Sequence, residues 1–211
     1  ADAYGHGAVP VAWHLLGHGV RSLGVGDSAE ALELRRHGIT APILILGAIV
    51  RGEMEQVVRG GISVTVHTAF RVRALARAAE KMGARVKVHL KVDTGMGRLG
   101  CAPERTLALA REIERSTHLE LEGIATHLAS PGPDGSKETE RQLARFRRVL
   151  DVLKTEGIEP RWRHALSSGG LLAAPPGEFN LVRPGLAVYG LSPNDRVTGV
   201  EPALTWKTQI V

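Results

Sequence analysis

Two short segments of the chain carry groups that could bind a phosphate. Ser167-Ser168-Gly169-Gly170 offers hydroxyl groups and free backbone N–H groups ahead of a predicted helix, and both favour an anion. Arg183-Pro184-Gly185-Leu186 adds a cation and a turn. An ordinary loop with a helix cap explains the first segment equally well. The two segments together predict an anion site.

A third segment, Asp93-Thr94-Gly95-Met96-Gly97-Arg98-Leu99-Gly100, matches the G-x-G-x-x-G pattern of dinucleotide-binding loops. The next helix is predicted to begin beyond the third glycine, near Pro103, so no helix N-terminus would face a pyrophosphate. The glycines could instead let a tight loop direct Arg98 into a site. A turn with a surface arginine is the simpler interpretation of the composition alone.

Tyr4 and His127 are isolated residues whose side chains could take part in chemistry. Tyr4 is one of two tyrosines in the chain and lies in the glycine-containing segment Ala3-Tyr4-Gly5-His6-Gly7. His127 follows a predicted strand. A tyrosine packed on a rim and a hydrogen-bonded structural histidine are the plain alternatives. One cysteine and scattered histidines give no zinc-ligand spacing, so we expect no metal.

Short strands alternating with helices must position these residues. Seven apolar or β-branched runs alternate with segments of helical period. The runs are Ser22–Val25, Pro42–Leu46, Ile62–Val66, Val86–Val92, Leu119–Thr126, Arg161–Leu166 and Leu181–Tyr189. The helical segments are Pro10–Leu16, Asp27–His37, Glu53–Val58, Thr68–Met82, Pro103–Ile113 and Glu138–Lys154. Asp27 and Glu30 have the spacing of a capping box.

This alternation predicts an α/β fold with a parallel sheet. One more strand before Ala1 would give the eight units of a (β/α)₈ TIM-type barrel, so we expect a barrel lacking its first strand, with an open doubly wound sheet as the rival. Barrels often bind phosphate between the loops after strands seven and eight, which here contain Ser168 and Arg183. We expect residues 1–192 to form the barrel and residues 193–211 to begin a C-terminal β domain, with a strand over Leu204–Val211.

Composition excludes several classes of function. With 211 residues, 43% hydrophobic and 23% charged, the chain can bury one sizeable core. The net charge of +5 is distributed among alternating acidic and basic residues, and aromatic residues make up only 4%, so nucleic-acid binding is not expected. No apolar run is long enough for a membrane span. A single cysteine and the lack of an export signal favour the cytoplasm.

Three segments together resemble alanine racemase. Ala1-Asp2-Ala3-Tyr4-Gly5-His6-Gly7 is similar to the end of a family signature in which a lysine comes immediately before the first residue. Lys91 to Gly100 resembles a second motif, and Val182-Arg183-Pro184-Gly185 through Tyr189-Gly190 a third. The resemblance extends over essentially the whole chain, with the motifs in family order.

The resemblance implies pyridoxal 5′-phosphate as the cofactor. The family positions that contact the cofactor phosphate are matched by Tyr4, Ser168, Gly185 and Leu186. By the same resemblance, Arg183 faces the pyridine nitrogen and His127 lies against the ring. A weaker match makes Leu46 a residue that lines the pocket.

Two further residues of the second motif receive roles by resemblance. Arg98 matches the catalytic arginine near the cofactor phenolic oxygen and the substrate carboxylate. Lys91 matches a lysine that is often carbamylated, whose acquired negative charge orients that arginine. Ser167 departs from the family, which usually has Asn there, and the loop Ala129–Ser136 departs as well.

The implied activity is interconversion of L- and D-alanine through an aldimine of the cofactor, which supplies D-alanine for peptidoglycan. The Schiff-base lysine would precede Ala1, and we favour its loss as a cofactor-modified residue over a chain cut after it. The second base would be a tyrosine from the partner's C-terminal domain in a homodimer, and Tyr189 is not assigned as that base. Alternatives are a broad-specificity amino-acid racemase or a non-catalytic carrier of the cofactor. A decarboxylase is less favoured because Arg183 replaces the expected acid.

Overall fold

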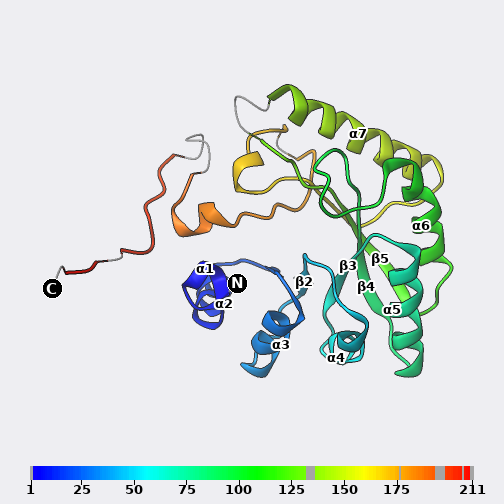
Figure 1. Cartoon of the computed structure of the whole chain (residues 1–211), viewed down its shortest axis with the longest axis horizontal. Coiled ribbons are helices and arrows are strands. Elements are labelled where there is room, and N and C mark those ends of the chain that lie inside the picture. Colours follow the sequence, from blue (N-terminus) through cyan, green and yellow to red (C-terminus); the bar gives the residue numbers. More distant parts are fainter. Residues whose placement is uncertain (1, 132–135, 176, 193–197, 206, 210–211) are drawn as a thin grey trace.

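Six parallel strands form one sheet whose strand order follows the chain, β1-β2-β3-β4-β5-β6 (Figure 1). The computed structural model describes residues 2–131, 136–175, 177–192, 198–205 and 207–209. The strands are β1 (Leu23–Val25), β2 (Ile43–Ile45), β3 (Ser63–Val66), β4 (Val86–Lys91), β5 (Leu119–Ala125) and β6 (Trp162–His164). Sequential parallel pairing requires a crossover after every strand, which is the pattern of a (β/α) barrel. The predicted α/β barrel architecture is confirmed.

Helices connect the strands and cover the outer face of the sheet (Figure 1). The α-helices are α2 (Ala8–Gly17), α3 (Ser28–Arg36), α4 (Met54–Arg59), α5 (Ala69–Lys81), α6 (Thr106–Glu114) and α7 (Ser136–Thr155), and they are preceded by α1 (Asp2–Gly5), a short turn with left-handed backbone. Four short 3₁₀ turns are η1 (Arg51–Glu53), η2 (Pro103–Arg105), η3 (Ser168–Gly170) and η4 (Leu186–Tyr189). All six predicted helices form, with boundaries shifted by a few residues. None of the described helices is both long and apolar enough to cross a bilayer.

The core lies between the sheet and these helices. Strands β2 and β3 are buried along their whole length, as expected for parallel strands covered on both faces. From the helical side, Leu75, Ile113 and Phe146 are completely buried. Phe146 of α7 packs against Phe179, with ring centroids 5.8 Å apart.

The capping box predicted at α3 forms only in part. The Asp27 carboxylate accepts a hydrogen bond from the Glu30 N–H at 3.0 Å, as predicted. The Glu30 carboxylate, however, accepts from the N–H groups of Gly26 and Asp2, each at 2.7 Å, and not from its own N-cap. Glu30 therefore joins the N-terminal segment to the end of β1.

The strand predicted over Leu181–Tyr189 is wrong. Only Arg183 makes a β-bridge there, parallel to Ser167, and η4 follows at Leu186. Pro184 has no N–H to donate, and the Ser168 hydroxyl accepts from the N–H groups of Gly185 and Ala187. The donors that a ladder would need are absent or engaged elsewhere.

The strand predicted over Leu204–Val211 does not form in residues 204, 205 and 207–209, where the backbone takes no regular structure. Residues 206, 210 and 211 lie outside the described residues, as do residues 193–197 of the predicted domain boundary and part of the loop Ala129–Ser136.

Replacing Phe146 by alanine should lower the free energy of unfolding by about 3–5 kcal/mol, because the change removes a fully buried ring and leaves a cavity. Phe70 on α5 is 69% exposed and provides the matched control, so Phe70→Ala should change that free energy by no more than about 0.5 kcal/mol. Urea unfolding of both variants measures the difference. Equal losses would contradict the position of the core.

Candidate active site

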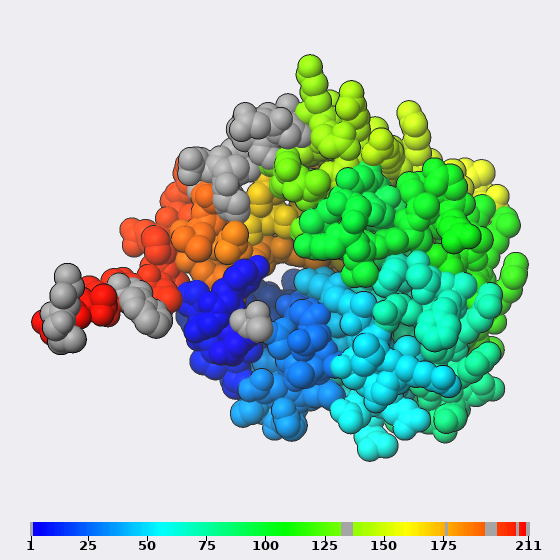
Figure 2. All heavy atoms as spheres, viewed as in Figure 1, coloured from blue at the N-terminus to red at the C-terminus, as the bar shows by residue number. Residues whose placement is uncertain are grey.

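The predicted site residues lie at or just beyond the C-terminal ends of the strands. Leu46 follows β2, Lys91 ends β4, His127 follows β5 and Ser168 follows β6. Because the strands are parallel, these ends meet at one edge of the sheet. Figure 2 shows the molecule hollowed near its centre, between the N-terminal residues in blue and the orange segment that includes Arg183. This edge is the candidate site.

Tyr4, Ser168 and Gly185 are brought together at this edge. The Ser168 hydroxyl is buried and accepts hydrogen bonds from Gly185 N at 2.8 Å and Ala187 N at 3.1 Å. A Cβ atom at Gly185 would lie 2.5 Å from the Tyr4 hydroxyl oxygen. Gly185 therefore leaves the space that the Tyr4 hydroxyl occupies. Leu186 continues this turn into η4.

The helix expected after Ser168 is only the three-residue turn η3, so no helix dipole contributes to an anion site there. The Ser168 hydroxyl instead accepts a hydrogen bond from Gly185 N and so holds the turn at Gly185. The residues predicted to bind an anion therefore bring together two hydroxyl groups and a glycine turn.

The segment that carries Tyr4 has an unusual backbone. Asp2, Ala3 and Tyr4 have φ angles of 51°, 52° and 57°, in the left-handed region that costs about 1–2 kcal/mol per L-residue. The Asp2 carboxylate accepts from Ala8 N, and Asp2 N donates to Glu30, each at 2.7 Å. The His6 ring stacks on Tyr189, with centroids 4.4 Å apart. These contacts hold a strained turn that aims Tyr4 at Gly185, a role for Glu30 and His6 that sequence reasoning missed.

Arg183 is fixed by acceptors from two strand ends. Its guanidinium donates to Nδ1 of His164 at 2.6 Å, to the Thr126 carbonyl at 2.8 Å and to the Ala165 carbonyl at 3.3 Å. Burial lowers the pKa of Arg183 to about 10, so the group remains charged at neutral pH. The guanidinium plane is thereby set by the fold.

Lys91 and His127 lie within the field of Arg183 and Arg98. Burial, then Arg183 and Arg98, lowers the pKa of Lys91 to about 8. Burial, then Lys91, Arg183 and Arg98, lowers the pKa of His127 to about 4. His127 is therefore neutral at pH 7. Positive charge is concentrated here and favours an anionic ligand.

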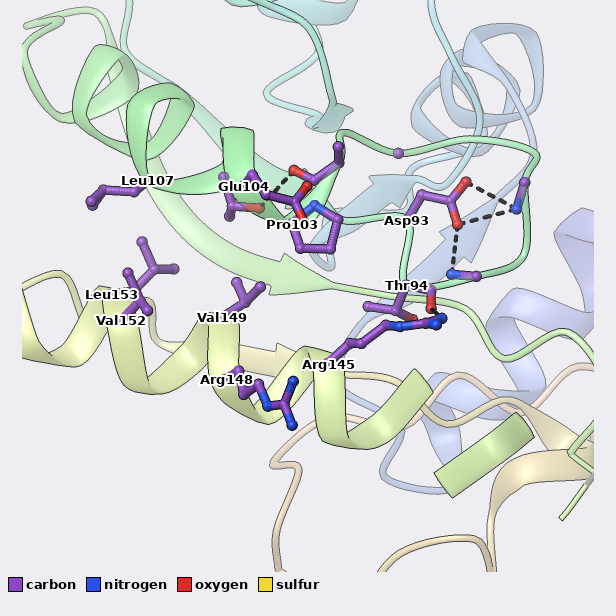
Figure 3. A pocket seen from close by; sticks show the side chains of 15 residues that line it. Asp93, Thr94, Pro103, Glu104, Leu107, Arg145, Arg148, Val149, Val152 and Leu153 are labelled. Carbon is purple, nitrogen blue, oxygen red and sulfur yellow. Dashed lines mark hydrogen bonds between the residues drawn. The ribbon is translucent and has the colours of Figure 1, made fainter. Parts of the chain in front are cut away.

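The loop that carries Arg98 is held by hydrogen bonds within the loop and by a hydrogen bond from α7 (Figure 3). The Asp93 carboxylate accepts hydrogen bonds from the N–H groups of Gly95 and Gly97, and Arg145 of α7 donates to the Thr94 carbonyl at 2.7 Å. Gly100 has φ +151°, and a Cβ there would overlap the backbone of Asp93. The glycines therefore serve a tight loop, and no helix N-terminus follows them, as the sequence predicted for a segment that does not bind a dinucleotide. The Arg98 side chain is exposed and close enough to influence both Lys91 and His127.

The remaining predicted residue, Leu46, is half-buried and lies against Gly24 of β1, where an added Cβ would be 3.1 Å from its methyl group. A separate groove of about 820 Å³ lies between α6 and α7, outside the sheet (Figure 3). Leu107, Val149 and Leu153 line its apolar part. It lies behind the Arg98 loop and does not include the Tyr4–Ser168–Gly185 contact.

Sequence reasoning missed three polar residues inside the sheet, His89, Glu122 and His164, which are almost completely buried. They form a hydrogen-bonded series that ends at Arg183. The sequence feature that could have revealed them is the presence of polar residues within otherwise apolar strands. Lys87, His89 and Lys91, for example, occupy every second position of one strand. That spacing marks side chains that share one face of a strand.

The low pKa of Lys91 predicts a specific pH dependence of stability. The folded pKa of about 8 lies below the ordinary value of 10.5, so the unfolded chain binds the proton first as the pH falls. The free energy of unfolding of the native protein therefore decreases as the pH falls from 10.5 to 8. Relative to the native protein, Lys91→Met should therefore gain on the order of 2 kcal/mol of unfolding free energy between pH 10.5 and 7.5 in CO₂-free buffer.

Lys87 on the same strand is the matched control, because its hydrogen bond to Glu122 raises its pKa. The contribution of Lys87 is present below its ordinary pKa and is lost at higher pH. Because that loss begins above pH 10.5, the difference between Lys87→Met and the native protein should stay nearly constant from pH 7.5 to 10.5 and should move in the opposite direction at higher pH. Parallel pH profiles for the two variants would contradict the buried position of Lys91.

Comparison with known proteins places this chain in a family. The family model described as "Alanine racemase, N-terminal domain" matches residues 1–193. The chain is 44% identical over 213 residues to the alanine racemase of Symbiobacterium thermophilum, covering 100% of this chain and 56% of that protein. It is 38% identical over 218 residues to the alanine racemase of Methanococcus maripaludis, covering 100% and 58% respectively.

Solved structures agree with this match. The alanine racemase of Clostridium difficile 630 in complex with cycloserine superimposes with a TM-score of 0.90 at 33% identity, over 95% of this chain and 56% of that one. The alanine racemase of Bacillus anthracis with bound L-Ala-P gives a TM-score of 0.86 at 34% identity, over 95% and 53%. The chain thus spans little more than half the length of these relatives. It belongs to the alanine racemase family and corresponds to the N-terminal domain of that family.

Proposed function

We propose that the protein interconverts L- and D-alanine with pyridoxal 5′-phosphate bound at the C-terminal ends of the strands. The observation that carries the proposal is the convergence of Tyr4, Ser168 and Gly185 beside a concentration of positive charge. Two hydroxyl groups can donate to a phosphate, and the missing Cβ of Gly185 leaves room for the Tyr4 hydroxyl at that turn. The residues present therefore fit the cofactor.

The family resemblance gives each residue a role, and the surroundings of several residues support it. Tyr4 and Ser168 would hold the phosphate at the Gly185–Leu186 turn. Arg183 would face the pyridine nitrogen. His127 would lie against the ring, and its pKa of about 4 keeps the imidazole uncharged there at neutral pH. Leu46 would line the pocket from β2.

The bound cofactor supplies an electron sink for the pair left when the α-proton of alanine departs. Arg183 limits how far that pair can move, because a guanidinium charged at neutral pH disfavours a proton on the pyridine nitrogen. When the electron pair is less delocalised into the ring, return of the proton to the α-carbon is favoured over side reactions. The arginine thus selects racemisation.

Arg98 would bind the carboxylate of the substrate, and Lys91 would orient Arg98 as a carbamate. An amine with a pKa of about 8 is partly neutral near pH 7.5, so its nitrogen can form a bond to CO₂ and release one proton. The resulting negative charge would offset the neighbouring guanidinium groups. If the carbamate forms, adding bicarbonate should reduce the advantage of Lys91→Met over the native protein. An unchanged difference would argue against it.

We propose that the proton-transferring groups, a lysine and a tyrosine of the partner subunit, lie outside these 211 residues in a homodimer. The chain would contribute the cofactor site and Arg98. A second domain beginning at residue 193 is supported by the end of the family match there. We further propose that the enzyme works in the cytoplasm and supplies D-alanine for peptidoglycan.

The full-length protein should convert L-alanine to the racemic mixture when loaded with pyridoxal 5′-phosphate, as followed by circular dichroism. Gly185→Ala should weaken binding of the cofactor at least ~10-fold, because the new methyl group meets the Tyr4 hydroxyl. Gly52→Ala is the control, since a Cβ there meets nothing within 4 Å. Binding without turnover would indicate a carrier, and equal turnover of serine would indicate a broad-specificity racemase.

Replacing Arg183 by glutamate should lower racemisation and raise side reactions such as transamination, because a carboxylate would favour a protonated pyridine nitrogen. The ratio of D-alanine to pyruvate, measured in one reaction mixture, gives the partition. Phe70→Ala again serves as the control, because its side chain is exposed on α5. A partition unchanged in Arg183→Glu would refute the role of the arginine.

A further inference from the structure

A series of hydrogen bonds leads from Arg183 away from the candidate site and into the interior of the sheet. Arg183 contacts Nδ1 of His164 at 2.6 Å, and Nε2 of His164 is 2.7 Å from Nδ1 of His89. Nε2 of His89 is 3.2 Å from the Glu122 carboxylate. The exposed fractions of His164, His89 and Glu122 are 1%, 2% and 8%. The four side chains come from β4, β5, β6 and the segment after them.

Arg183 determines which atom donates and which accepts in each hydrogen bond of the series. A guanidinium only donates, so Nδ1 of His164 must be the acceptor and its proton must be on Nε2. That proton can only be given to Nδ1 of His89, which places the proton of His89 on Nε2. Glu122 then accepts it. One cation thus fixes the tautomers of two imidazoles.

A second proton on either ring would face another donor. Protonating His89 at Nδ1 would bring its N–H against the N–H of His164, and protonating His164 at Nδ1 would bring it against Arg183. Burial and the charge of Arg183 lower the pKa of His164 well below its usual value. Hydrogen bonds from His89 and Lys87 lower the pKa of Glu122 to about 2. A permanent cation and a permanent anion are therefore joined through two neutral rings.

The groups that face this series hold it in place. Glu122 also accepts from Lys87 Nζ at 2.9 Å and from the Ser63 hydroxyl at 3.2 Å. The His89 ring lies so close to Gly123 that a Cβ there would overlap it. The two imidazoles meet edge to face, with centroids 4.9 Å apart. The His89 ring is therefore confined on the side that faces Gly123.

We propose that Glu122 is a positioning residue for the proposed reaction, acting on Arg183 through His89 and His164. The carboxylate strengthens each acceptor in turn, as a carboxylate does behind a histidine ligand or a catalytic histidine. His164 then holds one guanidinium N–H inward and leaves the plane of Arg183 fixed at the strand ends. The inference rests on the proposed function, because it assigns Arg183 to the pyridine nitrogen.

Glu122→Gln removes the charge and keeps the shape of the side chain. In the full-length, cofactor-loaded enzyme it should lower kcat for alanine at least ~10-fold and leave KM within about two-fold, since Glu122 does not contact the substrate. Glu120→Gln makes the same change on the same strand outside the series, and its kcat should match that of the native enzyme. Unchanged kcat in Glu122→Gln would overturn the proposal.

A double-variant cycle tests whether Glu122 acts through Arg183. In the Arg183→Ala background the loss caused by Glu122→Gln should disappear, because the group that it positions is gone. Losses that multiply in the double variant would show that Glu122 acts by another route, and would overturn the proposal.

Nitrogen NMR of the cofactor-free, ¹⁵N-histidine-labelled full-length protein gives a readout independent of turnover. At pH 8, His164 and His89 should each show one protonated nitrogen, Nε2. This measurement needs no variant, so it applies even if Glu122→Gln fails to fold. A ring protonated on both nitrogens, or on Nδ1, would overturn the series, whereas a correct spectrum in a protein without racemase activity would overturn the proposed function alone.

Discussion

The half-buried side chain of Arg183 constrains this part of the molecule more than any other group. A charge taken out of water must be given acceptors, or its burial costs several kcal/mol. The acceptors here are the carbonyl groups of Thr126 and Ala165 and the ring of His164, which belong to the ends of two neighbouring strands and the segments after them. The ends of β5 and β6 are therefore tied to each other by a cation as well as by their ladder. The position of the arginine and the register of the sheet are mutually dependent.

The excess positive charge at the strand ends has a cost that a bound anion would reduce. Lys91 and His127 both bind protons less readily than usual because Arg183 and Arg98 are close. Asp93, the nearby acid, directs its carboxylate to the loop amides of Gly95 and Gly97. The phosphate of the proposed cofactor, the carboxylate of the substrate and a carbamate on Lys91 would each supply negative charge. The proposed site would thus be preorganised for anions at some cost to the stability of the fold.

Much of this arrangement was predictable from the sequence, because hydrophobic periodicity and the order of the segments along the chain can be read directly from it. Alternating runs predicted the parallel sheet, and parallel strands place Lys91, His127 and Ser168 at one edge whatever their distance along the chain. The contact of Tyr4 with Gly185 was expected only through the resemblance, since left-handed backbone at Asp2, Ala3 and Tyr4 has no sequence signal without glycine. His89 and Glu122 were missed because partners 33 residues apart depend on sheet register. The bulge between Val88 and His89 sets that register and could not be predicted.

The failed strand at residues 181–189 shows how the site and the sheet compete for the same backbone. A strand there would pair its N–H groups along the edge of β6. Pro184 removes one of them, and Ser168 takes those of Gly185 and Ala187. Each hydrogen bond diverted in this way contributes about as much as the ladder bond that it replaces, so the exchange costs little stability. It converts a sheet edge into a turn, and that turn brings Gly185 to the Tyr4 hydroxyl and leaves Arg183 beside His164.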